Sequence, residues 1–132
     1  MAMPKLGTYL GFDFGTKQVG VAIGDTVTAS ARPLTTLPAD NGVVDSLLIS
    51  PLVHEWAPVG FVVGLPLTPE GEKGIIAHAA TRFANRLQAT FHLPSYQIDE
   101  RLTTQIARKL SADHPLDAKA AALILEAWLN SL

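Results

Sequence analysis

Three acidic residues of this sequence, Asp13, Glu100 and Asp117, each lie at a predicted strand end or helix start beside apolar residues. A carboxylate is costly to bury unless it has a partner, such as backbone amides, a cationic side chain or a metal ion. Oxygen ligands from separate segments are what Mg²⁺ and Mn²⁺ prefer in proteins. Two such ions can activate a water molecule and stabilise the leaving oxygen when a phosphodiester is hydrolysed. The three acids are therefore candidate metal ligands if the fold brings them together.

Each acid also has a purely structural interpretation, which the spacing leaves open. Asp13 could bond the backbone amides of the following turn, and Glu100 could pair with Arg101 or cap the next helix. Asp117 falls in the first turn of a predicted helix, where the helix dipole favours a carboxylate by roughly 0.3–1 kcal/mol. Asp99 would point to the side of a strand opposite to Glu100, and spacing does not decide which of the two faces Asp13.

The composition limits what other kinds of site the chain carries. Its 132 residues, 48% of them hydrophobic, predict one domain with a sizeable core. The absence of cysteine excludes disulfides, a thiolate nucleophile and cysteine-based zinc sites. The net charge of −2 requires a local basic surface, or neutralising metal, for any contact with nucleic acid. We see neither a signal peptide nor a bilayer-spanning run, so we expect a cytoplasmic protein with no membrane partner.

These acids are distributed over an alternation of predicted strands and helices. The pattern predicts strands over residues 8–14, 18–25, 32–38, 59–67 and 95–99. It predicts helices within residues 41–56, 72–89, 103–110 and 114–132. Strands that first follow one another and then alternate with helices indicate an α/β domain with a mixed central sheet.

The first two predicted strands each carry large residues on one face and small residues on the other. Phe12 and Phe14 share a face of the first strand, whereas Gly11, Asp13 and Gly15 share the opposite face. The second strand alternates in the same way, with Val19, Val21 and Ile23 set against Gly20, Ala22 and Gly24. A face of small residues lets another backbone, a helix or a ligand come close to Asp13.

Two of the predicted helices raise specific expectations. Pro51 cannot sit undisturbed inside a helix, so either the helix kinks there or Ser50 caps a second turn that begins with Pro51. The helix over residues 72–89 is amphipathic, and its spacing predicts four residues that face the core. These four are Ile76, Ala79, Phe83 and Leu87.

Four segments of the sequence resemble one known family. The stretches FDFGTKQVGVAIGD, VVGLPLTPEG, DERLTT and DAKAAALILEAWL have the order and spacing of the YqgF family, also called RuvX. Members of this family are described as pre-16S rRNA nucleases and Holliday-junction-resolvase-like proteins. The resemblance covers nearly the whole chain and implies an RNase H-like fold, in which helices flank a mixed five-stranded sheet.

The resemblance also implies roles for particular residues. The catalytic acids of the family correspond to Asp13, Glu100 and Asp117. These would also be the ligands of one or two Mg²⁺ or Mn²⁺ ions, and the correspondence selects Glu100 over Asp99. Three basic residues would position phosphates, namely Lys17, Arg101 and Arg108. Relatives often carry Arg where this chain has Gln18. We further expect the last helix, with Ala118, Ala121 and Ala122, to approach Gly11, Gly20 and Ala22 and so to carry Asp117 towards Asp13.

The function implied by the resemblance is that of a metal-dependent nuclease that processes the 5′ end of pre-16S rRNA, with ribosomal particles as possible partners. One alternative is a DNA-junction nuclease, which would act as a homodimer rather than a monomer because two strands are cut symmetrically. A second is a non-catalytic RNA-binding factor in ribosome assembly. An actin-like ATPase also opens with a D-x-G strand, but it needs two lobes, and 132 residues supply only one.

Overall fold

The strands form a mixed sheet that places the ends of β1 and β5 near one another. In the computed structural model, which describes residues 4–102 and 116–132, five strands lie in the order β3-β2-β1-β4-β5. The strands are β1 (Thr8–Asp13), β2 (Gln18–Asp25), β3 (Ser30–Pro38), β4 (Gly60–Leu65) and β5 (Ser95–Asp99). β1 pairs antiparallel with β2 and parallel with β4, and β5 runs parallel to β4. β2 and β3 are antiparallel. The predicted α/β class with a mixed five-stranded sheet is confirmed.

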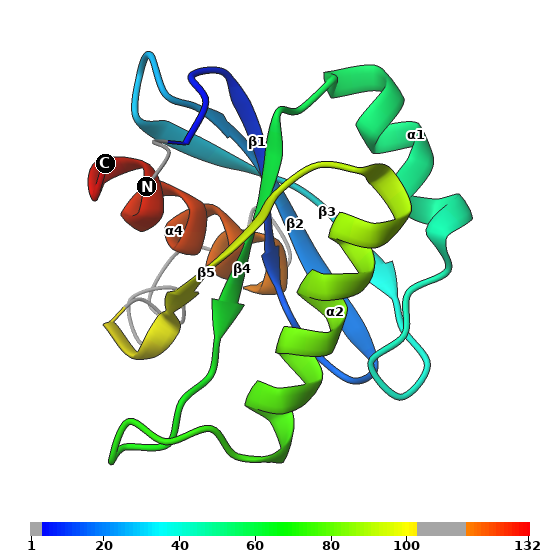
Figure 1. Cartoon of the computed structure of the whole chain (residues 1–132), viewed down its shortest axis with the longest axis vertical. Coiled ribbons are helices and arrows are strands. Elements are labelled where there is room, and N and C mark those ends of the chain that lie inside the picture. Colours follow the sequence, from blue (N-terminus) through cyan, green and yellow to red (C-terminus); the bar gives the residue numbers. More distant parts are fainter. Residues whose placement is uncertain (1–3, 103–115) are drawn as a thin grey trace.

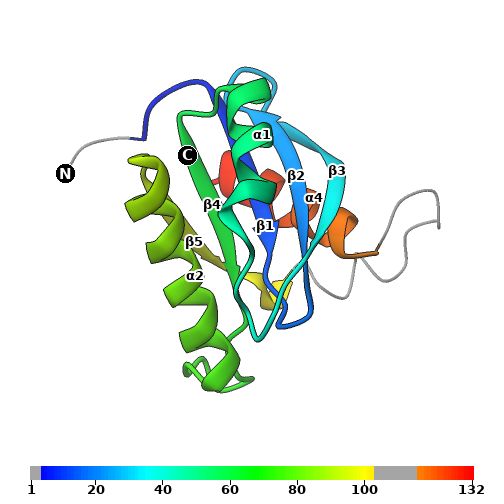
Figure 2. The same cartoon turned by 90° about the vertical axis from the view of Figure 1, so that its right-hand side faces the viewer.

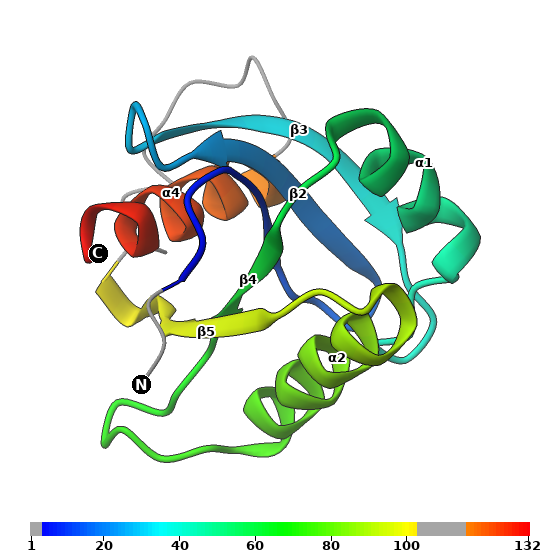
Figure 3. The ribbon, with the colours of Figure 1, turned by 45° about the horizontal axis from the view of Figure 1, so that its top comes forward.

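The helices cover both faces of this sheet (Figure 1). They are α1 (Ser46–Trp56), α2 (Ile75–Phe91), the short 3₁₀ helix η1 (Glu100–Leu102) and α4 (Leu116–Asn130). Two turned views show that α1 and α2 lie on one face and α4 on the other (Figures 2 and 3). The helix predicted over residues 103–110 lies outside the described residues.

The two faces of the sheet build two apolar layers. Large residues of β1 and β2, and Phe14 just after β1, pack against α1 and α2; those of the strands include Phe12, Val19, Val21 and Ile23. This confirms the predicted face of large residues. On the other side, Tyr9, Ala22 and Val62 pack against Leu125 and Trp128 of α4. The alternation along β1 therefore directs Asp13 to the side of α4.

α4 rests on the small residues of β1 and β2. A Cβ atom added at Gly11 would lie 2.6 Å from Cβ of Leu125, and one added at Gly20 would lie 2.0 Å from the backbone oxygen of Asp117. Ala118 is fully buried at this contact. The predicted approach of the last helix to the small-residue face is confirmed, and only residues without a side chain permit it at these two positions.

Two details of the helices differ from the sequence predictions. α1 runs through Pro51 as one helix, and Asp45 rather than Ser50 is its N-cap, with its carboxylate accepting a hydrogen bond from the Leu47 amide at 2.9 Å. The proposed second turn capped by Ser50 is therefore wrong. In α2, Phe83 and Leu87 are buried as predicted, and Ala79 is partly buried against the same apolar cluster. Ile76 is instead 45% exposed, because Ala77, Ala80 and Ala84 complete the inward face.

Within the described part of the chain, no helix is both long and apolar enough to span a membrane.

Candidate active site

Asp13 is the last residue of β1, the central strand of the sheet. Its partner across the antiparallel pair is Gly20, whose missing side chain leaves room for the backbone of Asp117. Burial, followed by the negative charges of Glu100 and then of Asp117, raises the pKa of the Asp13 carboxyl to about 7. Both acids therefore lie within electrostatic reach of Asp13.

Glu100 reaches this region from the end of β5. Asp99, its neighbour, pairs in register with Leu65, so Glu100 begins just where the β4–β5 pair ends. A Cβ atom added at Gly64 would lie 2.5 Å from Oε2 of Glu100 and 2.6 Å from Cδ1 of Ile124. The carboxylate thus occupies space that Gly64 leaves open between β4 and α4. Burial, and to a lesser extent the charge of Asp99, raises the pKa of Glu100 to about 6.

Asp117 lies in the first turn of α4, on the face of the sheet towards which Asp13 is directed. Its Oδ2 atom accepts a hydrogen bond from the side-chain amide of Gln18, the first residue of β2. α4 packs directly against Gly20, and this contact fixes the backbone of Asp117. In the sequence, Gln18 differs from the Arg of many relatives, and no pattern of single residues identifies Asp117 as its partner.

Asp99 has a different role from Glu100. Its carboxylate accepts from Nε of Arg101 at 3.0 and 2.9 Å and from Nη2 at 2.6 Å. The side-chain hydrogen bond from Arg101 lowers the pKa of Asp99. The structure therefore turns Asp99 to Arg101 and places Glu100, rather than Asp99, among the charges that act on Asp13.

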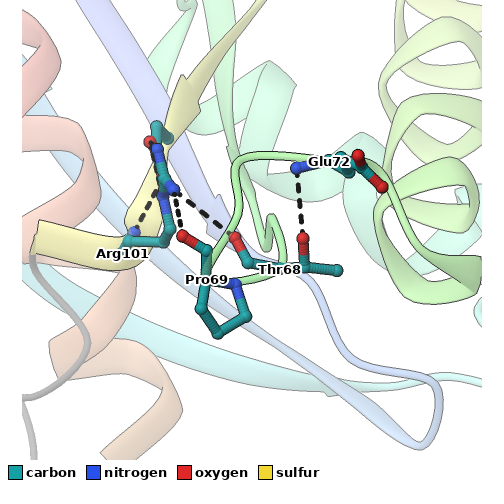
Figure 4. Close-up of polar contacts among 5 residues, drawn as sticks. Thr68, Pro69, Glu72 and Arg101 are labelled. Atoms are coloured by element: carbon teal, nitrogen blue, oxygen red, sulfur yellow. Dashed lines mark hydrogen bonds and ion pairs between the residues drawn. The ribbon is translucent and has the colours of Figure 1, made fainter.

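The three basic residues selected from the sequence have different surroundings. Lys17 is exposed in the turn between β1 and β2, four residues after Asp13. Arg101 donates from Nη1 to the backbone oxygens of Thr68 at 3.4 Å and Pro69 at 3.2 Å, as Figure 4 shows. Arg108 lies outside the described residues. Their predicted contacts with phosphates remain predictions.

The donor set suits a hard divalent cation. In the described residues, no group of three or more Asp, Glu, His or Cys side chains is already close enough together to hold a metal ion. The chemistry nevertheless fits, because Asp13, Glu100 and Asp117 supply only carboxylate oxygens, which Mg²⁺ and Mn²⁺ prefer. Burial raises the pKa of Asp13 most, and repulsion from Glu100 and Asp117 adds to it; a divalent cation would offset this repulsion.

Comparison with known proteins accounts for almost the whole chain. A family model described as "RuvX: Holliday junction resolvase" matches residues 7–131. This chain belongs to the RuvX family. A relative from Pseudomonas putida, named "Putative pre-16S rRNA nuclease", is 45% identical over 139 residues and covers 98% of this chain and 99% of that protein. A Pseudomonas fluorescens Pf0-1 relative of the same name is 47% identical over 131 residues, covering 92% of this chain and 90% of that protein.

Solved structures place the RuvX chain in the same fold as junction resolvases. Thermus thermophilus RuvC in complex with a Holliday junction substrate superposes with a TM-score of 0.60 at 15% identity, over 94% of both chains. The yeast mitochondrial Holliday junction resolvase Ydc2 gives a TM-score of 0.58 at 12% identity, covering 97% of this chain and 80% of that chain. At these identities the likeness concerns the fold, and it confirms the RNase H-like class predicted from the sequence.

Proposed function

We propose that this RuvX-family chain is a metal-dependent nuclease that hydrolyses phosphodiester bonds, with precursor 16S rRNA as its substrate. The observation that carries the proposal is the convergence of Asp13, Glu100 and Asp117 from β1, the end of β5 and the start of α4. The curated relatives of nearly equal length that bear a pre-16S rRNA nuclease name support the choice of substrate.

Asp13, Glu100 and Asp117 would hold one or two Mg²⁺ or Mn²⁺ ions at the end of β1. Such ions supply Lewis-acid stabilisation of the charge that develops on the phosphate and leaving oxygens. Without a cation, burial and the charges of two nearby acids raise the pKa of Asp13 to about 7, so its carboxyl keeps a proton below that pH. Asp13 must therefore release that proton when it becomes a ligand, so that cation affinity increases with pH.

The substrate surface has to offset the negative charge of the chain. The net charge is −2, so nucleic acid is attracted by local cations rather than by the protein as a whole. Lys17 is well placed for this role, because the turn that carries it follows directly from Asp13 and is exposed. Ribosomal particles would provide further contacts, and a pre-rRNA substrate places the activity in the cytoplasm.

The experiment is a cleavage assay on three labelled substrates: a single-stranded RNA, a structured rRNA precursor and a four-way DNA junction. Each is incubated with Mg²⁺, Mn²⁺ or EDTA, with the wild type, Asp13→Asn and the control Glu55→Gln. Glu55 is an exposed acid on α1, so its neutralisation should leave cutting unchanged. We expect cation-dependent cutting of the rRNA precursor that Asp13→Asn abolishes.

Two results would contradict this function. Preferred cutting of the junction, by a protein that behaves as a dimer in solution, would indicate the resolvase activity for which the family model is named. Binding of RNA or ribosomal particles without any cutting by folded wild-type protein would indicate a non-catalytic assembly factor.

A further inference from the structure

Arg101 connects the end of β5 to the loop that follows β4. On one side its guanidinium forms the ion pair with Asp99, which uses both Nε and Nη2. On the other side its Nη1 donates to the backbone oxygens of Thr68 and Pro69. Figure 4 shows Arg101 reaching from η1 to the loop. The planar fork of an arginine suits this double engagement, because it presents five N–H donors in a fixed geometry.

The segment 66–74 is itself an organised loop. Thr68 forms most of the hydrogen bonds described within this loop. The Thr68 amide donates to the backbone oxygen of Glu72 at 2.9 Å, and the Thr68 backbone oxygen accepts from the Gly71 amide at 2.8 Å. The Thr68 hydroxyl accepts from the amide of Glu72 at 3.1 Å. Gly71 has a φ of +85°, and a Cβ atom added there would lie 3.5 Å from Nη1 of Arg101. Arg101 therefore lies against a closed turn rather than an extended segment.

The base of this loop lies beside the candidate active site. Leu65, the last residue of β4, pairs with Asp99, and the preceding Gly64 provides the space for the carboxylate of Glu100. Glu100 and the loop therefore leave the sheet at the same end. Arg101 follows Glu100 directly, so the contacts that hold the loop start one residue from a proposed metal ligand.

We propose that Arg101, paired with Asp99, is a positioning residue that fixes the 66–74 loop as one wall of the nucleic-acid path beside Glu100. The proposal rests on the proposed nuclease function of that site. It assigns Arg101 a role different from the direct phosphate contact implied by the family resemblance. The loop contributes its shape to substrate binding, and the Asp99–Arg101 pair maintains that shape.

The two roles for Arg101 predict different behaviour for Asp99. If Arg101 holds the loop through Asp99, removing either partner releases the same contacts, and the double variant is no worse than the single variants. If Arg101 binds a phosphate directly, Asp99→Ala leaves its positive charge free and does not weaken substrate binding. Arg101→Lys retains the charge but not the fork, so a positioning role also predicts that lysine fails to restore function.

The test uses Arg101→Ala, Arg101→Lys, Asp99→Ala and the double variant Arg101→Ala/Asp99→Ala of the full chain. Lys5→Ala is the control, because it removes one positive charge from an exposed residue near the N-terminus. Asp99→Asn is a second variant in case Asp99→Ala fails to fold. The first readout is hydrogen exchange at the amides of Thr68, Gly71 and Glu72, and the second is KM and kcat for the labelled rRNA precursor.

We expect all four variants to lose protection at the three loop amides and to show the same rise in KM, about tenfold, with kcat changed less. Lys5→Ala should match the wild type in both readouts. Unchanged exchange in Arg101→Ala, or normal KM in Asp99→Ala beside a raised KM in Arg101→Ala, would overturn the proposal. Failure of the proposed function is distinguishable, because the wild type would then cut no substrate while the exchange data still report on the loop.

Discussion

The side-chain amide of Gln18 donates a hydrogen bond to the carboxylate of Asp117, which lies 99 residues later in the chain. This contact joins the start of β2 to the first turn of α4 across the candidate active site. It occupies Oδ2 of a proposed metal ligand. In the same arrangement, the described residues contain no ready-made group of three metal-binding side chains. A cation that takes the place of this amide at Oδ2 therefore competes with Gln18 for Asp117.

Replacing Gln18 with alanine should tighten the binding of Mn²⁺. In Gln18→Ala the ion no longer has to displace this hydrogen bond. Because a typical hydrogen bond contributes about 1 kcal/mol, we expect the Kd for Mn²⁺ to fall about fivefold. Titration calorimetry with Mn²⁺ alone measures this Kd directly, and Asn85→Ala, which removes an exposed amide on α2, is the matched control. Weaker binding in Gln18→Ala would show instead that Gln18 orients Asp117 for the ion.

The stability of the cation-free protein should fall as the pH rises from about 4 to neutrality. The pKa of Asp13 is about 7 in the folded protein and near 3.8 in the unfolded chain, so the native state binds more protons between these values. Glu100 adds to this effect between about 4.5 and 6. The free energy of unfolding therefore decreases with rising pH across this window, by no more than about 4 kcal/mol for Asp13.

Urea unfolding in EDTA at pH 4.5, 6 and 7.5 measures this slope. Asp13→Asn should be more stable than the wild type at pH 7.5, and the advantage should shrink towards pH 4.5, where Asp13 is protonated in the native state. Subtracting the two curves removes the contributions of the other acids, including Asp99, whose lowered pKa acts in the opposite direction. A pH-independent difference would mean that Asp13 titrates normally.

How far the sequence predicts this site depends on the kind of interaction involved. The alternation of large and small residues in β1 and β2 is a local pattern, so it correctly predicted that a helix packs on the face of Asp13. The choice between Asp99 and Glu100 was not local. It depends on Gly64 opening a space for Glu100, which follows from the pairing of β4 with β5. The ion pair of Arg101 with Asp99, two residues away, accompanies this arrangement.

Side chains that meet across long stretches of sequence were not predictable in this way. Neither the Gln18–Asp117 bond nor the contact of Arg101 with Thr68 has a periodic signature. The exposure of Ile76 has a different cause, because small alanines, Ala77 and Ala80, take buried positions in α2. Hydrophobicity alone ranks Ile76 above these alanines, so it places Phe83 and Leu87 correctly and Ile76 wrongly.

Divalent cations should stabilise the wild type at pH 7.5 and should do so through Asp13. A ligand that binds only the native state adds about 2.7 kcal/mol to the free energy of unfolding at 100 times its Kd. Melting curves with increasing Mn²⁺ should therefore shift upwards for the wild type and Glu55→Gln. Asp13→Asn lacks one ligand and should respond little. Equal shifts in all three proteins would place the cation elsewhere on the molecule.

Replacing Gly20 with alanine should displace α4 and, with it, Asp117. The added Cβ atom would lie 2.0 Å from the backbone oxygen of Asp117 and 2.2 Å from its carbonyl carbon, so backbone rather than a flexible side chain has to move. Overpacking of this kind typically costs about 1–3 kcal/mol of the free energy of unfolding. The Mn²⁺-induced rise in melting temperature should also be lost, because one proposed ligand is moved.

Gly74→Ala provides the comparison for this variant. A Cβ atom at Gly74 would meet only Cγ2 of Thr68, at 3.8 Å, which is an ordinary contact distance. Gly74 is also the N-cap of α2, so alanine there should reduce stability slightly, by much less than Gly20→Ala. Thermal melts of both variants, with and without Mn²⁺, make the comparison. If Gly20→Ala keeps the stability and the Mn²⁺ response of the wild type, α4 does not rest on Gly20, and Asp117 is not held beside Asp13 by this contact.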